Sequence, residues 1–267
     1  MENNPIQSLW VRGELTTMEK LCIRSFLKNG HDFHLYVYDD VTGVPEGATI
    51  RDGKKILSED KIFTYQTEGF GKGEVAGFAD WFRYALLFKK GGWWVDTDVI
   101  CVRRFDFNQE KILATNYEGP NNDMANNCVM KLPAGNPLAK YCLEVCENVD
   151  PSTLDFAETG PVLVQEGVRE LELREYTVPG HVFCPVSYQY VQDLVSSPIG
   201  LWERLKRTLW SRQPTGKIQD DTYAVHLWNQ MWKNADLDKE GMYPPDSIYE
   251  NLKRRYLSRA TSSVTPQ

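Results

Sequence analysis

The sequence lacks any apolar run long enough to span a bilayer. Its 267 residues hold no stretch approaching the roughly 18 apolar residues that a spanning helix needs. Residues 1–7 are polar and do not look like a secretion signal. The chain also lacks an internal repeat, and its only biased segment is the polar tail Thr261–Gln267. These absences disfavour membrane-spanning, secreted and repeat proteins, so we expect a cytoplasmic globular protein.

Basic charge is scarce. The 30 Lys and Arg residues are outnumbered by 37 Asp and Glu residues, which gives a net charge of -7. Nucleic-acid-binding proteins need a basic face, so we expect no nucleic-acid partner. With 42% apolar and 25% charged residues, the composition is typical of a globular protein. We expect one domain over residues 1–267.

Cysteines are few and scattered. The six cysteines lie among apolar neighbours, so free buried thiols are favoured over disulfides. Cys142 and Cys146 are one helical turn apart, but no second close pair exists. A structural zinc site needs such a pair, so the spacing does not predict one.

The stretch Phe78–Cys101 predicts a helix that runs into a strand. Apolar residues in Phe78–Leu86 recur at i, i+3, i+4, i+7 and i+8, the spacing of a helix packed on a sheet. Two lysines and Gly91 then favour the end of the helix. Trp93–Cys101 is rich in β-branched and aromatic residues, which predicts a short buried strand.

Asp96 and Asp98 interrupt this strand. Side chains two apart in an extended strand leave the same face, roughly 6.6 Å from each other. Burying two like charges costs several kcal/mol unless a cation compensates them, and oxygen ligands favour Mg²⁺ or Mn²⁺. On spacing alone, the alternative is a strand that ends at Val95 and is followed by a solvated turn, since Asp-x-Asp is a weak motif.

The N-terminal part predicts a βαβ unit. Ile6–Val11 is typical of a strand, a capping box at Thr16 begins a helix that ends at Asn29, and Phe33–Tyr38 is typical of a second strand. This order indicates a parallel sheet, and ligands bind such sheets beyond the carboxyl ends of the strands. Trp10 and the two aspartates fall at such ends.

The remaining elements are predicted from shorter patterns. They are a helical patch near Ile56–Ile62, strands at Ile112–Asn116, Cys128–Leu132, Val178–Cys184 and Tyr223–Trp228, a helix at Pro137–Asn148, and a helix opened by Thr159-Gly160-Pro161.

The central residues resemble a known family. Asp80-x-x-Arg83, followed by Gly91-Gly92-aromatic-aromatic-x-Asp96-x-Asp98, resembles the glycosyltransferase family with a DXD sugar-binding region. The pattern is also similar to the catalytic domains of clostridial glucosylating toxins. The resemblance extends from Pro5 to Trp228 and is dense only in the centre.

The resemblance implies an α/β fold of the GT-A type, a Rossmann-like mixed sheet flanked by helices with a helical C-terminal annex. Residues 1–132 would form the nucleotide-sugar-binding core, and residues 133–260 the acceptor-side and helical part.

The resemblance also implies roles for individual residues. Asp96, Asp98 and His226 would hold the metal, and the two aspartates would be the catalytic residues. Thr159, Gly160 and Pro161 would face the acceptor side. The implied donor-binding residues are Trp10, Asp80, Arg83, Trp94, Trp228 and Trp232.

Several of these residues have a simpler interpretation. Trp10 also fits a core tryptophan, and Asp80 with Arg83 fits a plain i,i+3 salt bridge. His226 also fits a structural histidine. Trp228 and Trp232 either donate their indole N–H groups to a diphosphate or form an ordinary helical pair.

The predicted function is a metal-dependent retaining glycosyltransferase. It would use Mn²⁺ or Mg²⁺ to move a sugar from a nucleotide-sugar, favoured as a UDP-sugar, to a hydroxyl of a glycan or lipid-linked glycan. Glu158, Asp123 and Asp221 cannot be ranked as a general base. A glycoside hydrolase with paired carboxylates and a non-catalytic sugar-binding module are the alternatives.

Leu201–Arg212 predicts an amphipathic helix with tryptophans on one side and basic residues on the other. This pattern is typical of a segment lying at a membrane surface, and it also fits a stripe packed on the protein. We expect a cytoplasmic enzyme with a peripheral membrane contact at this segment.

Overall fold

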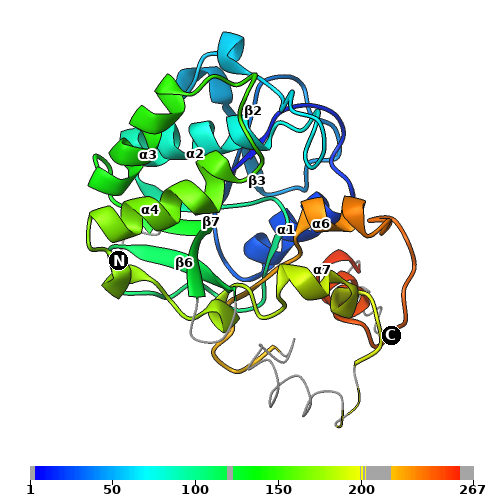
Figure 1. Cartoon of the computed structure of the whole chain (residues 1–267). Helices are drawn as coiled ribbons and strands as arrows, with labels where there is room; N and C mark the ends of the chain where they lie inside the picture. Colours follow the sequence, from blue (N-terminus) through cyan, green and yellow to red (C-terminus); the bar gives the residue numbers. More distant parts are fainter. Residues whose placement is uncertain (1–3, 119–122, 199, 201, 203–217, 259–267) are drawn as a thin grey trace, which may run out of the picture.

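The structure is a computed structural model that describes residues 4–118, 123–198, 200, 202 and 218–258 (Figure 1). Six strands form its central sheet in the order β3-β2-β1-β4-β7-β6. They are β3 (Ala48–Asp52), β2 (Phe33–Val37), β1 (Ile6–Trp10), β4 (Gly92–Val95), β7 (Asp123–Leu132) and β6 (Ile112–Tyr117). The first four strands are parallel to one another, and β7 is antiparallel to both β4 and β6. The predicted mixed sheet is therefore confirmed.

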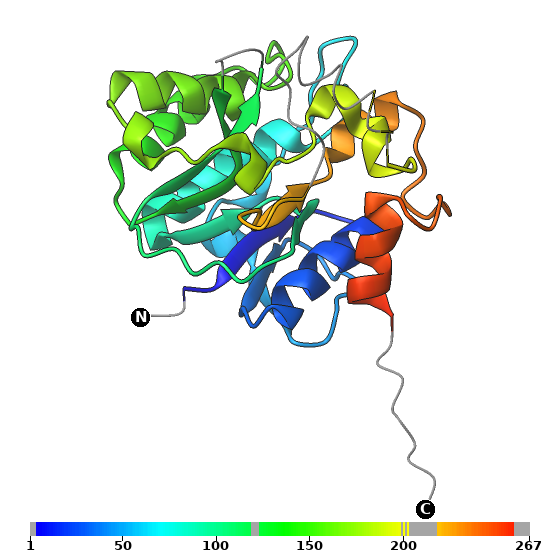
Figure 2. The same cartoon turned by 90° about the horizontal axis from the view of Figure 1, so that it is seen from below.

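Helices cover both faces of this sheet. One layer comprises α2 (Ala76–Lys90), α3 (Pro137–Asn148) and α4 (Leu163–Glu170), and the other pairs α1 (Thr17–Lys28) with α7 (Ile248–Leu257). Figure 2 shows the sheet between α3 and α4 in green on one side and α1 in blue with α7 in red on the other. A short second sheet pairs β5 (Val99–Cys101) with β8 (Ala224–His226), and α6 (Asn229–Asn234) follows it.

Two apolar clusters lie on the two faces because side chains alternate along each strand. Trp93 and Val95 belong to the cluster under α1 and α7, whereas Trp94 between them belongs to the cluster under α2 and α3. The α1 cluster also contains Val225 and Tyr249, so the last elements of the chain pack against the first.

The strand predicted at Val178–Cys184 is wrong. The chain there forms a 3₁₀ turn over Gly180–Val182. Before the turn, the Val178 N–H donates to the Leu113 carbonyl of β6 (3.0 Å), but no strand forms. Pro179 and Pro185 flank the turn, and proline has no N–H to donate to a sheet.

No strand was predicted at β3, which the structure adds to the edge of the central sheet, and the other elements follow the predictions with shifted boundaries. The patch near Ile56–Ile62 consists of 3₁₀ turns at Gly53–Lys55 and Glu59–Lys61, and Ala224–His226 is the strand inside the predicted Tyr223–Trp228. All six cysteines are free and buried, as predicted. Within the described residues, no helix is both long and apolar enough to cross a membrane.

Candidate active site

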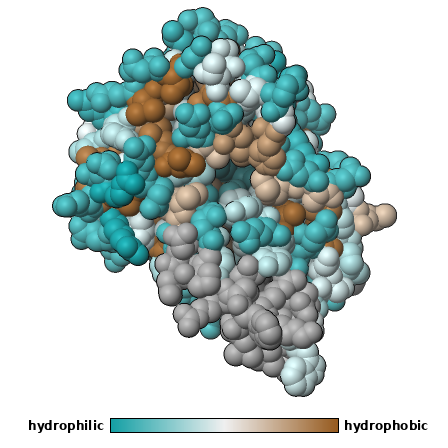
Figure 3. All heavy atoms as spheres, viewed as in Figure 1, coloured by the Kyte–Doolittle hydropathy of each residue, from teal (hydrophilic) through white to brown (hydrophobic). Residues whose placement is uncertain are grey.

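A cleft with a cavity volume of about 800 Å³ opens where β1 and β4 end. Figure 3 shows this face hollowed, with apolar residues along part of the rim. The predicted site residues that line the cleft are Trp10, Asp80, Arg83, Trp94, Asp96, Asp98, Pro161, His226 and Trp228. The ends of parallel strands therefore form the site, as expected from the βαβ order.

The two aspartates lie in a turn and not in a strand. After Val95 the chain leaves the central sheet, and at Val99 it enters the small sheet with β8. The Asp96 N–H donates to the Cys128 carbonyl (2.9 Å), and the Asp98 carbonyl accepts from the Leu227 N–H (2.9 Å). The continuous strand Trp93–Cys101 was therefore a wrong prediction. The turn is not solvated either, since the Asp98 residue is only 7% exposed.

Asp96, Asp98 and His226 bring two carboxylates and an imidazole together. One ligand atom from each lies within 4.8 Å of the others. The Asp98 Oδ2 atom lies 3.4 Å from His226 Nε2 and accepts the Asn229 backbone N–H at 2.7 Å. This set of hard oxygen and imidazole ligands fits Mn²⁺ or Mg²⁺.

Protons and a cation compete for this set. Burial alone would raise the pKa of Asp98, but His226 and the Asn229 N–H lower it overall. Burial would likewise lower the pKa of His226, yet attraction to Asp98 raises it well above the usual range. A cation bound through His226 must therefore displace a proton that Asp98 stabilises on the imidazole.

Arg83 joins the helix α2 to the aspartate turn. Its Nη1 atom donates to Asp80 Oδ1 at 2.9 Å and its Nη2 atom to Asp96 Oδ1 at 2.5 Å. The guanidinium carbon lies 4.8 Å from the centroid of the Trp94 ring, and the Trp94 indole N–H donates to the same Asp96 oxygen at 2.8 Å. The i,i+3 salt bridge thus exists and also orients Asp96.

Asp80 is held by two further side chains. It accepts from Asn127 Nδ2 at 2.8 Å and from the Thr159 hydroxyl at 3.3 Å, besides Arg83. A Cβ at Gly160 would lie 3.1 Å from Asp80 Oδ2, so any larger residue here would crowd the Asp80 carboxylate. Burial raises the pKa of Asp80 to about 6. Thr159 and Gly160 are buried behind Asp80, and of the acceptor-side triplet Pro161 alone lines the cleft.

Besides Trp94, the three other predicted donor-binding tryptophans differ in how their N–H groups are used. Trp10 is half-buried at the cleft and donates to the Gly13 carbonyl at 3.0 Å. Trp228 lines the cleft but donates to the Val186 carbonyl (2.8 Å). Trp232 is fully buried away from the cleft and donates to the Leu227 carbonyl (2.6 Å). The expectation that Trp228 and Trp232 offer free N–H groups to a diphosphate is therefore wrong.

The Trp228 ring has a different role. Its centroid lies 3.9 Å from that of His226, and its backbone adopts φ 59° in the left-handed region. Such a backbone is uncommon for a bulky residue and marks functional sites more often than ordinary loops. The strained residue fixes the imidazole by stacking.

Sequence patterns missed several polar residues of the cleft. Asn126, Asn127, Asn116 and Glu118 line it, and the first two lie in the part of β7 before Cys128, where no strand was predicted. The signal that the sequence offered was three asparagines among the apolar residues of β6 and β7. Glu158, Asp123 and Asp221 do not line the cleft. The segment Leu201–Arg212 falls outside the described residues apart from Trp202, which is 80% exposed.

Comparison with known proteins identifies the chain. Residues 17–118 match the family model of the glycosyltransferase sugar-binding region containing the DXD motif, and residues 133–262 match the α1,4-glycosyltransferase conserved region. A human α-1,4-N-acetylglucosaminyltransferase is 24% identical over 213 residues, which are 78% of this chain. The chain spans 58% of the length of that relative.

Two solved structures are also similar. A structure titled PaToxG glycosyltransferase covers 95% of this chain and 85% of its own, with a TM-score of 0.47 and 14% identity. A transferase double mutant covers 64% of this chain and 85% of its own, with a TM-score of 0.42 and 12% identity.

The matched families define the class of protein: the chain is a glycosyltransferase. Residues 17–118 match the family whose sugar-binding region contains the DXD motif, here Asp96-Thr97-Asp98, and the α1,4-glycosyltransferase conserved region follows this match.

Proposed function

We propose that this chain transfers a sugar from a nucleotide-sugar, favoured as a UDP-sugar, to a hydroxyl of a glycan through an α-1,4 link. The observation that carries the proposal is the convergence of Asp96, Asp98 and His226 inside the cleft. The α-1,4 link is supported by the second matched family region and by the name of the human relative. Because common UDP-sugars carry an α-linked sugar, this product corresponds to retention.

Asp96, Asp98 and His226 would hold the divalent ion, which we propose to be Mn²⁺. When bound, the ion supplies positive charge that neutralises the leaving diphosphate. The ion pair of Arg83 with Asp80 and Asp96 keeps the ligand geometry fixed before the donor binds, so little reorganisation is needed during transfer.

Trp10 offers a half-buried ring at the end of β1, where we place the nucleotide base. Its N–H is already bonded to Gly13, so the ring contributes stacking and not hydrogen bonding. Stacking on an aromatic ring is worth about 1–3 kcal/mol per base. Asp80 lies deeper, next to Arg83, and its cleft-facing position suits contact with sugar hydroxyls.

Among the described residues, every carboxylate that lines the cleft already has a partner. Asp80 and Asp96 are paired with Arg83, Asp98 with His226, Glu74 with Lys233, and Glu118 with the Tyr188 hydroxyl at 3.0 Å. We therefore infer that the acceptor proton passes to an oxygen of the departing diphosphate.

Nucleotide release from a panel of UDP-, GDP- and ADP-sugars, with Mn²⁺, Mg²⁺ or EDTA, tests the proposal. We expect release with a UDP-sugar and Mn²⁺, loss of release in EDTA, and loss in Asp98→Asn. Exposed Asp106→Asn is the matched control and should keep full activity. Release of sugar from a glycan in EDTA, without any nucleotide, would instead indicate a hydrolase.

We further propose that the enzyme works at the cytoplasmic face of a membrane through Leu201–Arg212, on a lipid-linked acceptor. The support is the basic amphipathic pattern of this segment in a chain of net charge -7. Cosedimentation with anionic liposomes at low and high salt tests this contact. Binding should be lost at high salt and in Arg204→Glu/Arg207→Glu.

A further inference from the structure

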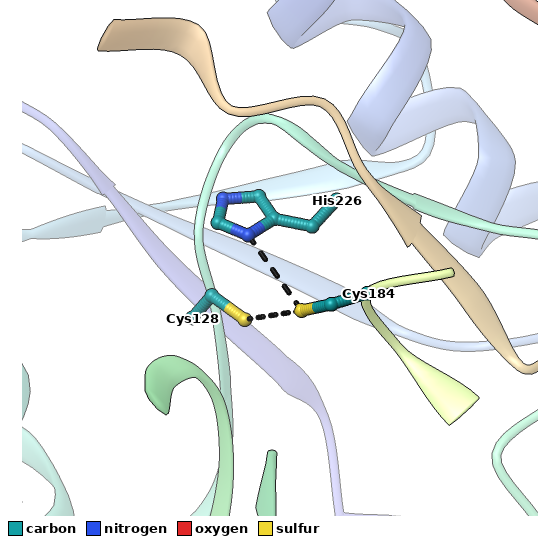
Figure 4. Close-up of side chains that lie close together, drawn as sticks. All are labelled: Cys128, Cys184 and His226. Atoms are coloured by element: carbon teal, nitrogen blue, oxygen red, sulfur yellow. Dashed lines mark hydrogen bonds between the residues drawn. The ribbon is translucent and has the colours of Figure 1, made fainter. Parts of the chain in front are cut away.

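A second group of metal-ligand side chains lies directly behind the first. Cys128 of β7, Cys184 after the Gly180–Val182 turn and His226 of β8 are brought together from distant parts of the sequence, and all three are buried. Figure 4 shows the two sulfur atoms and one imidazole nitrogen pointing toward one another. The spacing along the chain gives no hint of this group, because 56 residues separate the two cysteines.

Two of the three separations match those around a tetrahedral ion, and the ligand atoms of all three residues lie within 4.8 Å of one another. Sγ of Cys128 lies 3.7 Å from Sγ of Cys184, which lies 3.8 Å from Nδ1 of His226. Zn–S bonds of about 2.3 Å and Zn–N bonds of about 2.0–2.1 Å at tetrahedral angles place sulfurs about 3.8 Å apart and sulfur and nitrogen about 3.6 Å apart. The side chains therefore need only small shifts to accept such an ion.

His226 is shared by the two groups through different nitrogens. Its Nε2 atom faces Asp98 at 3.4 Å, and its Nδ1 atom faces Cys184. A neutral imidazole has one lone pair on one nitrogen and an N–H on the other. It can therefore ligate through only one side at a time unless it loses its second proton.

We propose that Cys128, Cys184 and His226 Nδ1 form a second metal site for a thiophilic divalent ion such as Zn²⁺, and that its occupation excludes a cation at Asp96 and Asp98. The exclusion rests on the proposed role of His226 in the catalytic site. The thiolate site itself does not depend on that role. Thiolates select ions of this kind, whereas carboxylates select Mn²⁺ and Mg²⁺.

The binding step is balanced in protons. The ion forms bonds to two sulfurs and to Nδ1, both thiol protons and the Nδ1 proton of the imidazolium leave to solvent, and the other imidazole proton stays on Nε2, facing Asp98. That N–H cannot ligate Mn²⁺, so the catalytic set is reduced to two carboxylates. A water molecule fills the fourth position, because the three side chains leave one open. His226 lines the cleft, which gives an ion its path.

A disulfide between the two cysteines is a poorer interpretation. An S–S bond requires about 2.05 Å, so the observed separation would have to shrink considerably.

Titration of the metal-free protein with Cd²⁺, read by the ultraviolet thiolate-to-metal charge-transfer band, tests the site without any activity measurement. We expect one equivalent to bind in the wild type, and about tenfold or more weaker binding in Cys184→Ala. Cys142→Ala is the matched control, since Cys142 is equally buried on α3 and belongs to neither metal-ligand group. It should titrate like the wild type. Thermal melting confirms that each variant is folded.

The exclusion is tested by Zn²⁺ inhibition of Mn²⁺-dependent nucleotide release. Added Mn²⁺ should relieve the inhibition, and Cys184→Ala should be at least tenfold less sensitive to Zn²⁺. Inhibition that Cys184→Ala leaves unchanged would place Zn²⁺ at the aspartates and overturn the exclusion. Absence of the Cd²⁺ band in folded wild type, or its persistence in Cys184→Ala, would overturn the site, whether or not the protein transfers sugar.

Discussion

The two walls of the cleft are held in place by different interactions. On the wall formed by α2 and β4, the charged side chains of Asp80, Arg83 and Asp96 bond to one another. On the wall formed by β8 and α6, Trp228 and Trp232 bond to backbone carbonyls, and His226 is stacked against Trp228.

One wall is therefore held by charged side chains and the other by packed aromatic side chains. The α2 and β4 wall presents fixed charges to the cleft, and each is compensated by a neighbour because unpaired charges are costly to bury. The β8 and α6 wall provides aromatic surface and a single imidazole. Changes on the first wall should therefore act through electrostatics, and changes on the second through packing, with the ligand set of Asp96, Asp98 and His226 joining both.

Removing a ligand carboxylate should have the largest effect. Asp98→Asn should lower turnover on the order of 10³-fold, because the amide removes the charge that holds the cation. Asp96→Asn should come close to this loss, and both variants should remain folded. Calorimetry of Mn²⁺-UDP binding provides the check. Full-strength binding by Asp98→Asn would contradict the metal assignment.

Breaking the Arg83 bridge should cost stability as well as activity. Arg83→Met leaves Asp80 and Asp96 buried without their cation, and breaking a buried pair this way costs about 3–5 kcal/mol of unfolding free energy. Urea unfolding measures it. The exposed Arg103, which pairs with Asp106, provides the control: Arg103→Met should change stability by less than about 1 kcal/mol.

Asp80 should make stability depend on pH. Its pKa is raised from 3.8 to about 6 by burial, so the folded protein binds this proton more tightly than the unfolded chain. Below pH 4 this proton adds about a few kcal/mol to the free energy of unfolding. The contribution is lost as the pH rises through about 6. Urea unfolding between pH 4.5 and about 7 should show this loss in the wild type. A curve for Asp80→Asn with the same slope would assign the pH dependence to other groups.

The smallest effect should come from the aromatic side chains. Trp10→Ala should raise the donor KM with little change in kcat, since about 1–3 kcal/mol of base stacking is lost equally from ground and transition states. Trp232→Phe is the contrasting variant. It should leave KM unchanged and lower the melting temperature slightly, because it removes a buried hydrogen bond far from the donor. Equal shifts of KM in both variants would contradict the prediction that Trp10, but not Trp232, contacts the donor. So would a Trp10→Ala variant that loses only thermal stability.

Sequence patterns alone located the principal elements and most of the cleft. The stripe of α2, the βαβ unit and the two aspartates are local features, since helix spacing, strand alternation and a tight motif all act over short stretches of chain. From them the end of β1 and the aspartate turn could be placed at one edge of a parallel sheet. The family resemblance then singled out Arg83 and His226, which spacing could not have ranked above other charged residues.

The tertiary structure alone decided which side chains meet. The two aspartates lie close to His226 because the chain passes from one sheet to another after Val95, and not because they share the face of a strand. Asn127 and Thr159 support Asp80 from 47 and 79 residues away, and Cys128 and Cys184 meet behind His226. Such contacts depend on how distant segments pack, and a single sequence carries no periodic signal for them.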